Sequence, residues 1–119
     1  VVDEVFAFFE QKLDELARGA FPEEHILLDP GIGFGKTLEH NLALLQNIER
    51  FYALGRPLLL GLSYKSFLGE ITGALLGERC LASATASALL AARGVWAHRV
   101  HDVRETKQAL ELARAISKK

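Results

Sequence analysis

Residues 28–37, Leu-Asp-Pro-Gly-Ile-Gly-Phe-Gly-Lys-Thr, decide the fold of this 119-residue chain. An apolar run over residues 25–28 stops at Asp29, and Pro30 and three alternating glycines follow before a helix-like pattern begins. Such a segment is typical of a strand whose end delivers a carboxylate to a flexible loop. In parallel α/β proteins ligands bind at that end of the strands, so the sequence predicts a binding site here.

Glycine-rich loops between a strand and a helix often bind nucleotide phosphates, and two such motifs can be tested here. A Walker A loop needs a glycine where Pro30 stands, and proline has no N–H to offer a phosphate. The dinucleotide fingerprint needs G-x-G-x-x-G, whereas Gly31, Gly33 and Gly35 follow one another as G-x-G-x-G. Both comparisons argue against a nucleotide site. A merely mobile loop is the other alternative, although it gives no reason for an acid and an aromatic residue within the loop.

Helical and strand patterns alternate along the chain. The order α-βα-βα-βα with short connections demands a parallel sheet with right-handed crossovers, so the predicted fold class is α/β. Asp102 is expected to cap the last helix, with Glu105 as its capping-box partner. The predicted elements are helix 1–18, strand 25–29, helix 38–52 closed by Gly55, strand 57–62, helix 77–93, strand 95–101 and a helix that begins after Asp102.

Composition narrows the class of protein. Half of the residues are apolar and the formal net charge is −1, which suits one globular unit and gives no electrostatic reason to expect nucleic acid or a membrane surface. No apolar run is long enough to span a bilayer, and the start lacks the features of a signal peptide. A cytoplasmic protein is expected. Cys80 is the only cysteine, so no internal disulfide is possible, and an inert buried thiol is the favoured interpretation.

The predicted helix 77–93 is rich in alanine, serine and leucine and carries almost no charge in its middle. A helix that is apolar on most sides is usually covered on most sides. Packing against the sheet and its neighbours explains this pattern, and a subunit interface explains it equally well.

Polar residues follow each predicted strand. Asp29 can accept two parallel hydrogen bonds from a planar N–C–N edge, or it can cap the N–H groups of its own loop. Arg99 and His101 are two residues apart and share a strand face, where a guanidinium fork and an imidazole can bind an oxyanion. His98 and Val100 point the other way, and His98 is expected to be structural. No histidine and acid spacing predicts a metal cluster.

Lys65 lies between two serines after the second predicted strand, and its ammonium group could donate to a ring oxygen or nitrogen. A loop lysine is more often simply solvated. The Ser63-x-Lys65 spacing also occurs in Ser–Lys hydrolases, but no oxyanion-hole signature accompanies it.

Three motifs, D-P-G-I-G-F-G-K at 29–36, G-L-S-Y-K-S-F-L-G at 61–69 and H-R-V-H-D-V at 98–103, together resemble the C-terminal half of dihydropteroate synthase. They come in that family's order and the resemblance covers nearly the whole chain. The second motif departs from the usual Ser-Arg-Lys-Ser, because Tyr64 replaces the arginine. The resemblance implies three βα units of a parallel (β/α)₈ TIM barrel preceded by one helix. Residues 1–119 would form the C-terminal half of a pterin-binding domain, since a complete barrel needs roughly 200 residues or more.

The resemblance also implies an activity. The family is a transferase that condenses p-aminobenzoate with (7,8-dihydropterin-6-yl)methyl diphosphate in folate biosynthesis, and a fragment alone is expected to be inactive. Mg²⁺ is expected with the diphosphate, bound by a protein ligand outside this chain, and a homodimer is expected. The implied catalytic residues are Lys65, Arg99 and His101. The implied substrate contacts are Asp29 and Lys65 for the pterin, Gly33, Phe34 and Ser63 for the aminobenzoate, and Arg99 and His101 for the diphosphate.

Two other functions stay open. A pterin-binding methyltransferase domain on the same barrel should keep a pterin-binding acid, but it has no need of the Arg99 and His101 pair. A non-catalytic fragment that only folds and self-associates is the second alternative.

Overall fold

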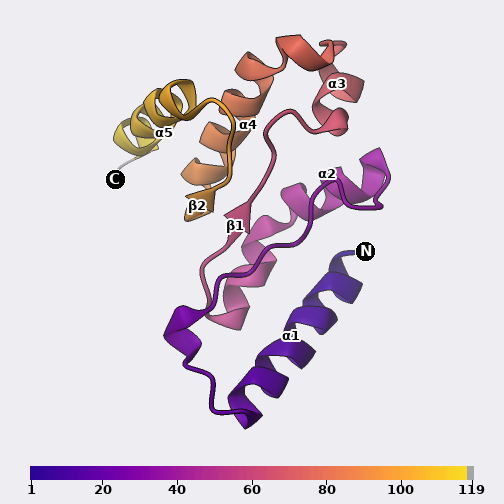
Figure 1. The fold of residues 1–119 in the computed structure, drawn as a ribbon, viewed down its shortest axis with the longest axis vertical. Coiled ribbons are helices and arrows are strands. Elements are labelled where there is room, and N and C mark those ends of the chain that lie inside the picture. Colours follow the sequence, from indigo (N-terminus) through magenta and orange to yellow (C-terminus); the bar gives the residue numbers. More distant parts are fainter. Residues whose placement is uncertain (118–119) are drawn as a thin grey trace.

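The computed structural model describes residues 1–117 and contains helices at both ends of an elongated molecule of 45 × 33 × 24 Å. In Figure 1, α1 lies beside α2, and α4 and α5 pack together at the opposite end. The elements are α1 (Val2–Arg18), a 3₁₀ helix (Glu23–His25), α2 (Leu38–Gln46), a 3₁₀ helix (Ile48–Leu54), β1 (Leu59–Leu60), α3 (Ser66–Thr72), a 3₁₀ helix (Leu76–Glu78), α4 (Cys80–Ala92), β2 (Ala97–His98) and α5 (Val103–Ser117).

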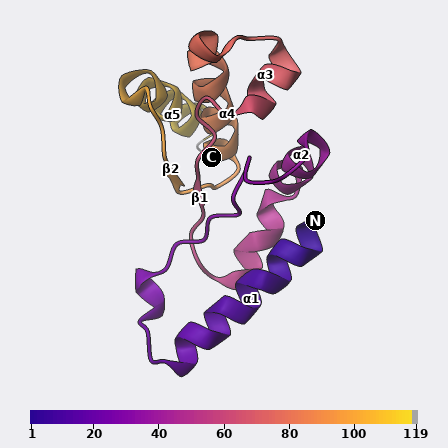
Figure 2. The same cartoon turned by 45° about the vertical axis from the view of Figure 1, so that its right-hand side comes forward.

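The predicted parallel pairing is confirmed. Leu28 forms a parallel bridge with Leu58. The two residues that follow Leu58 form β1, and they pair in parallel with β2. The three extended segments therefore lie side by side in chain order. Figure 2 shows β1 and β2 between the helical ends of the molecule.

The predicted strands are too long, however. Residues 57–62 and 95–101 form ladders of only two residues each, and 25–29 contributes a single bridge. At the start of the first segment, His25 already belongs to a 3₁₀ helix. Pro57 lies opposite this segment. Its carbonyl accepts a hydrogen bond from the N–H of Leu28, but proline has no N–H that could donate to the segment. The ladder can therefore begin only after the proline.

The first two predicted helices differ in how well they match the structure. The predicted helix 1–18 is confirmed as α1, and Gly19 follows its last residue. The predicted helix 38–52 is wrong in its second half, because α2 ends at Gln46 and a 3₁₀ helix continues to Leu54. The side chain of Asn47 donates to the Ala43 carbonyl at 2.8 Å, the same oxygen that its backbone N–H contacts at 3.1 Å. Such local competition for a carbonyl is typical of a helix end.

The region between β1 and α4 differs most from the prediction. The predicted helix 77–93 begins only at Cys80, and Leu76–Glu78 form a separate 3₁₀ turn. The seven-residue helix α3 was not predicted at all. It spans about two turns, which is too short for an apolar period to show in the sequence. Gly73 ends it with φ at +78°, a conformation that suits glycine.

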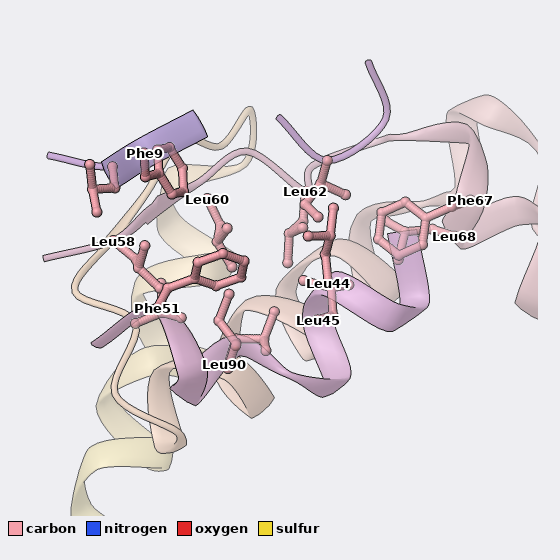
Figure 3. Packing of buried hydrophobic residues seen from close by; sticks show 14 residues of the cluster. Phe9, Leu44, Leu45, Phe51, Leu58, Leu60, Leu62, Phe67, Leu68 and Leu90 are labelled. Atoms are coloured by element: carbon pink, nitrogen blue, oxygen red, sulfur yellow. The ribbon is translucent and has the colours of Figure 1, made fainter. Parts of the chain in front are cut away.

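The core joins the strands to the helices on one side (Figure 3). Leu58, Leu60 and Leu62 are all fully buried, as the alternation of side chains along an extended segment requires. Phe51 is also fully buried, and its ring meets that of Phe9 edge to face at 5.7 Å. The remaining members of the buried cluster are Leu28, Ile32, Leu44, Leu45, Ile48, Phe67, Leu68, Leu90 and Val95.

The surface keeps a considerable amount of apolar area. Leu81 and Leu89 of α4 are 79% and 64% exposed, although Ser83 and Ser87 on its other side are buried. Trp96, next to β2, is 65% exposed. The buried side of α4 accounts for its packing within the chain, and the exposed side remains available to another surface. Within residues 1–117, no helix is both long and apolar enough to cross a membrane.

Phe51→Ala is expected to lower the free energy of unfolding by about 3–5 kcal/mol, because it empties a fully buried aromatic site. Phe8→Ala is the matched control, since Phe8 is 54% exposed, and it should cost less than about 1 kcal/mol. Urea denaturation of both variants is the measurement. Equal losses for the two would contradict the assignment of the core.

Candidate functional site

The glycine loop after Leu28 is held in shape by its own polar groups. The N–H of Gly31 donates to Asp29 Oδ1 at 2.9 Å, and Lys36 Nζ donates to the Gly31 carbonyl at 2.9 Å and to the Phe34 carbonyl at 3.3 Å. Gly31 and Gly33 have φ of +72° and +86°, which larger residues rarely adopt. The loop therefore turns tightly and leaves the Phe34 ring 62% exposed. Asp29 therefore does cap an N–H of its own loop, which was the alternative interpretation, but it uses only Oδ1 for this.

Asn41 is a site residue that the sequence analysis missed. It lies on α2 and is only 3% exposed, and its Oδ1 accepts the N–H of Gly33 at 2.9 Å. The signal was a polar residue among the leucines of the apolar stripe that begins at Leu38. A buried amide needs a partner, and here the partner is the glycine loop.

Five of the predicted site residues line one pocket of about 230 Å³. The pocket lies where the glycine loop, the end of β1 and the end of β2 come together. Lys65 Nζ stands 4.0 Å above the centre of the Phe34 ring, which is a cation–π contact. A Cβ on Gly33 would lie 3.0 Å from Lys65 Cδ, so Gly33 also touches this lysine. The lining residues are Phe34, Gly61, Ser63, Lys65, Arg99, Val100 and His101.

Arg99 connects this pocket to Asp29. Its Nη1 is 3.4 Å from Asp29 Oδ2, and the two side chains are 55% and 34% exposed. Such an exposed ion pair contributes roughly 0–1 kcal/mol, so a ligand can replace it at little cost. Asp29 keeps lone pairs for further donors, because its hydrogen bond to Gly31 uses only one of about four acceptor positions.

His101 is oriented by Ser63. The Ser63 hydroxyl is 2.9 Å from His101 Nδ1 and accepts the backbone N–H of His101 at 3.2 Å. Ser63 is itself 6% exposed. Arg99 and His101 line the same pocket, as their spacing predicts. Val100 borders this pocket as well, but it also lines the groove of His98, the side toward which it was expected to point.

His98 lies on the opposite face of β2, in a groove with Trp96 and Arg114 of α5. Neither ring nitrogen has a hydrogen-bond partner among the described residues. Burial lowers the pKa of His98 below its usual value, and the charge of Arg114 acts in the same direction. The structure therefore keeps this histidine apart from the pocket, as the sequence analysis expected.

Gly61 is the second residue that the sequence analysis missed. It directly follows β1. A Cβ at this position would lie 2.9 Å from Arg99 Cζ and 3.1 Å from Arg99 Nε. The guanidinium of Arg99 therefore rests directly on the backbone of residue 61. Sequence alone gave no signal, because only the pairing of the two strands brings positions 61 and 99 together.

Within residues 1–117 one group of side chains could be considered for a metal ion, and it consists of Cys80, Asp102 and Glu105. The Asp102 carboxylate already accepts a hydrogen bond from Tyr64. The pKa of the Cys80 thiol is raised, mainly by hydrogen bonding to the same carboxylate and to a smaller extent by burial. A protonated thiol is a poor ligand for Mg²⁺, which prefers oxygen atoms in octahedral geometry. This group does not fit Mg²⁺.

Comparison with known proteins identifies the family of this chain. The profile of the family described as "Pterin binding enzyme" matches residues 1–101. The chain belongs to the pterin-binding enzyme family. Curated relatives are dihydropteroate synthases from Haemophilus influenzae, 36% identical over 117 residues, and Neisseria meningitidis serogroup B, 41% identical over 120 residues. Both alignments cover 98% of this chain but 42% of the relative, so the chain spans less than half their length.

Solved structures of the same family superpose closely. The dihydropteroate synthase of Stenotrophomonas maltophilia with active site-bound imidazole matches with a TM-score of 0.94 and 43% identity, over 98% of this chain and 44% of that one. The enzyme of Xanthomonas albilineans in complex with 7,8-dihydropteroate gives a TM-score of 0.94 and 38% identity, over 99% and 45%. The parallel α/β arrangement of this chain is therefore that of part of a pterin-binding enzyme.

Gly61→Ala is expected to leave the fold intact, because the atoms that its methyl group meets belong to the mobile end of Arg99. The guanidinium must then leave its place beside Asp29. On the expectation that Arg99 and His101 bind an oxyanion, affinity for pyrophosphate should fall by about tenfold or more. Calorimetry with pyrophosphate is the measurement, made on the pterin-binding enzyme at its natural length.

Two comparisons sharpen this test. Gly77→Ala, at a glycine with open space around it, should leave the affinity unchanged. In an Arg99→Ala background, Gly61→Ala should have no further effect, because the group that it displaces is gone. Additive losses would show that Gly61 does not act through Arg99.

Proposed function

We propose that this chain is the C-terminal half of a dihydropteroate synthase, which condenses p-aminobenzoate with (7,8-dihydropterin-6-yl)methyl diphosphate. The observation that carries the proposal is the arrangement of three charged groups. The Asp29 carboxylate, the Arg99 guanidinium and the Lys65 ammonium come from three different segments and meet at one end of the parallel segments. The reaction needs an acceptor for the pterin, donors for the leaving group and a pocket for the arylamine.

The pterin would lie against Asp29. Its 2-amino and N3 edge is a planar pair of donors, and a carboxylate accepts two such hydrogen bonds in parallel. Asp29 Oδ2 forms a weak ion pair with Arg99. A ligand can therefore replace Arg99 at this oxygen at little cost. Lys65 would then leave the face of Phe34 and donate to the ring, since its flexible stem allows this movement.

The diphosphate would bind between Arg99 and His101. As the arylamine nitrogen attacks the methylene carbon, the bond from that carbon to the diphosphate oxygen breaks and the oxygen gains negative charge. The nitrogen then releases one proton to water and becomes a secondary amine. The guanidinium fork and the imidazole line one wall of the pocket and can stabilise this charge. Ser63 supports the step indirectly, because its buried hydroxyl already holds His101.

The aminobenzoate would lie near Phe34, in the part of the pocket that the glycine loop covers. The ring of Phe34 is exposed and carries the Lys65 ammonium on one face. Gly33 leaves room for that lysine. Orientation of the two substrates, rather than proton transfer by the protein, would supply most of the rate.

Mg²⁺ would accompany the diphosphate and neutralise part of its charge, and its protein ligand would lie outside this chain. A pterin-binding methyltransferase is the less favoured alternative. It needs the acid at position 29, but it gives no reason for Arg99 and His101 to share a pocket.

The same proposal accounts for the exposed apolar surface. The missing half of a (β/α)₈ barrel would cover the outer edges of the sheet, and a homodimer would cover the exposed face of α4, where a groove of about 380 Å³ includes Leu81 and Leu89. A cytoplasmic location is also part of the proposal.

Asp29→Asn is expected to weaken binding of a pterin analogue by about 1–3 kcal/mol while the fold persists. The amide keeps an oxygen for the N–H of Gly31, but it turns an N–H₂ group toward the donor edge of the pterin. Calorimetry on the natural-length protein is the measurement. Asp14→Asn, which changes an exposed acid on α1, is the control and should have no effect. Unchanged affinity in Asp29→Asn would remove Asp29 from the site.

The isolated 119-residue chain is expected to self-associate and to show no turnover. Open sheet edges and exposed apolar side chains favour association, and the rest of the pterin pocket is not in this chain. A coupled assay for diphosphate release, run together with analytical sedimentation, is the measurement. Full turnover by a stable monomer of this length would refute the half-barrel proposal.

A further inference from the structure

Tyr64 occupies an unusual position between two of the pocket residues, Ser63 and Lys65. Its φ is +59°, in the left-handed region that bulky residues seldom adopt. The backbone is held there from both sides. Its N–H donates to the hydroxyl of Ser83 on α4 at 2.9 Å, and its carbonyl accepts from Arg79 Nη1 at 3.2 Å. A residue that its neighbours hold in a strained conformation is often part of a functional site. The contacts of the Tyr64 side chain indicate what that function is.

The side chain of Tyr64 contacts the residues that follow β2. Its hydroxyl donates to Asp102 Oδ2, and its ring lies 5.2 Å from the ring of His101, tilted by 42°. The hydrogen bond to Asp102, together with burial and the carboxylate charge, raises the pKa of Tyr64 to about 12. The phenol therefore stays protonated, and the anchor persists across the neutral pH range.

His101 is in this way fixed from more than one direction. Ser63 contacts its Nδ1 and its backbone N–H, and the Tyr64 ring packs beside the imidazole. Asp102, to which the hydroxyl is tied, is the next residue in the chain. Loss of the hydroxyl would free both the ring and the Asp102 carboxylate, and His101 would lose a neighbour that limits its rotation.

We propose that Tyr64 is a positioning residue, which holds the His101 imidazole toward the pocket through its ring and through its anchor on Asp102. It does not act by binding the anion itself, because its only donor is already used by Asp102. The consequence for anion binding rests on the proposed function, in which His101 contacts the diphosphate. The consequence for the orientation of His101 does not.

The test compares the only two tyrosines of the chain, each changed to phenylalanine in the protein at its natural length. Tyr64→Phe keeps the ring and removes the anchor. Tyr52→Phe removes a hydroxyl that donates to the Arg93 carbonyl at 2.7 Å, and it is the matched control because neither Tyr52 nor Arg93 lines the pocket. Two quantities are measured, namely the affinity for pyrophosphate by calorimetry and the imidazole signals of His101 by NMR, assigned with His101→Gln.

Tyr64→Phe is expected to shift or broaden the His101 signals and to weaken pyrophosphate binding by about three- to tenfold. Binding of a pterin analogue that lacks the diphosphate should be unchanged. Tyr52→Phe should alter none of these. Asp102→Asn keeps an acceptor oxygen and should give a smaller effect, and combining it with Tyr64→Phe should add nothing.

Unchanged His101 signals in Tyr64→Phe would overturn the inference. Shifted signals with unchanged pyrophosphate affinity would support the positioning of His101 by Tyr64, and they would contradict the proposed contact of His101 with the diphosphate. Equal effects in Tyr52→Phe would overturn it as well, because they would mean general loosening of the fold. If the parent protein binds neither pterin nor pyrophosphate, the proposed function fails, and the NMR comparison alone decides whether Tyr64 orients His101. Should Tyr64→Phe fail to fold, Asp102→Asn decides with the same two measurements.

Discussion

The parallel register of three short extended segments is the constraint on which the rest of this structure depends. Leu28 bridges Leu58, and the residues that follow Leu58 pair with Ala97 and His98. Because all three segments run in the same direction, the residues just beyond them meet at one edge. The polar and charged residues of the site, Asp29, Ser63, Lys65, Arg99 and His101, lie just beyond these segments. A shift of one residue in any pairing would turn Arg99 or Ser63 to the other face.

The sequence predicted the parts of this arrangement that are local. Asp29 could be singled out because it follows an apolar run, and Arg99 because it shares a strand face with His101, whereas the role of Lys65 came only from the family resemblance. The apolar stripe of α1 is long enough to show a helical period. Strand lengths could not be predicted, because they depend on donors across the ladder, and Pro57 supplies none. The break after Gln46 depends on one amide, that of Asn47, which competes for a carbonyl.

Other features could not be predicted, because they exist only between distant segments. Nothing near Gly61 in the sequence indicates that a guanidinium lies on its backbone. The contact of Tyr64 with His101 likewise joins residues 37 positions apart in sequence (101 − 64), and it requires both the pairing of β1 with β2 and the docking of α4. Asp102 illustrates a partial success. It stands directly before α5 as predicted, yet its carboxylate accepts the Tyr64 hydroxyl.

The close approach of Arg99 to Gly61 has a consequence for the evolution of this family. A side chain at position 61 and an arginine in this pose at position 99 exclude one another in space. The two positions therefore cannot drift independently while the arginine is needed. Among homologous sequences, a residue larger than glycine at the first position should appear together with loss or relocation of the cation at the second. Such linked substitution would mark lineages in which this end of the site has taken on different chemistry.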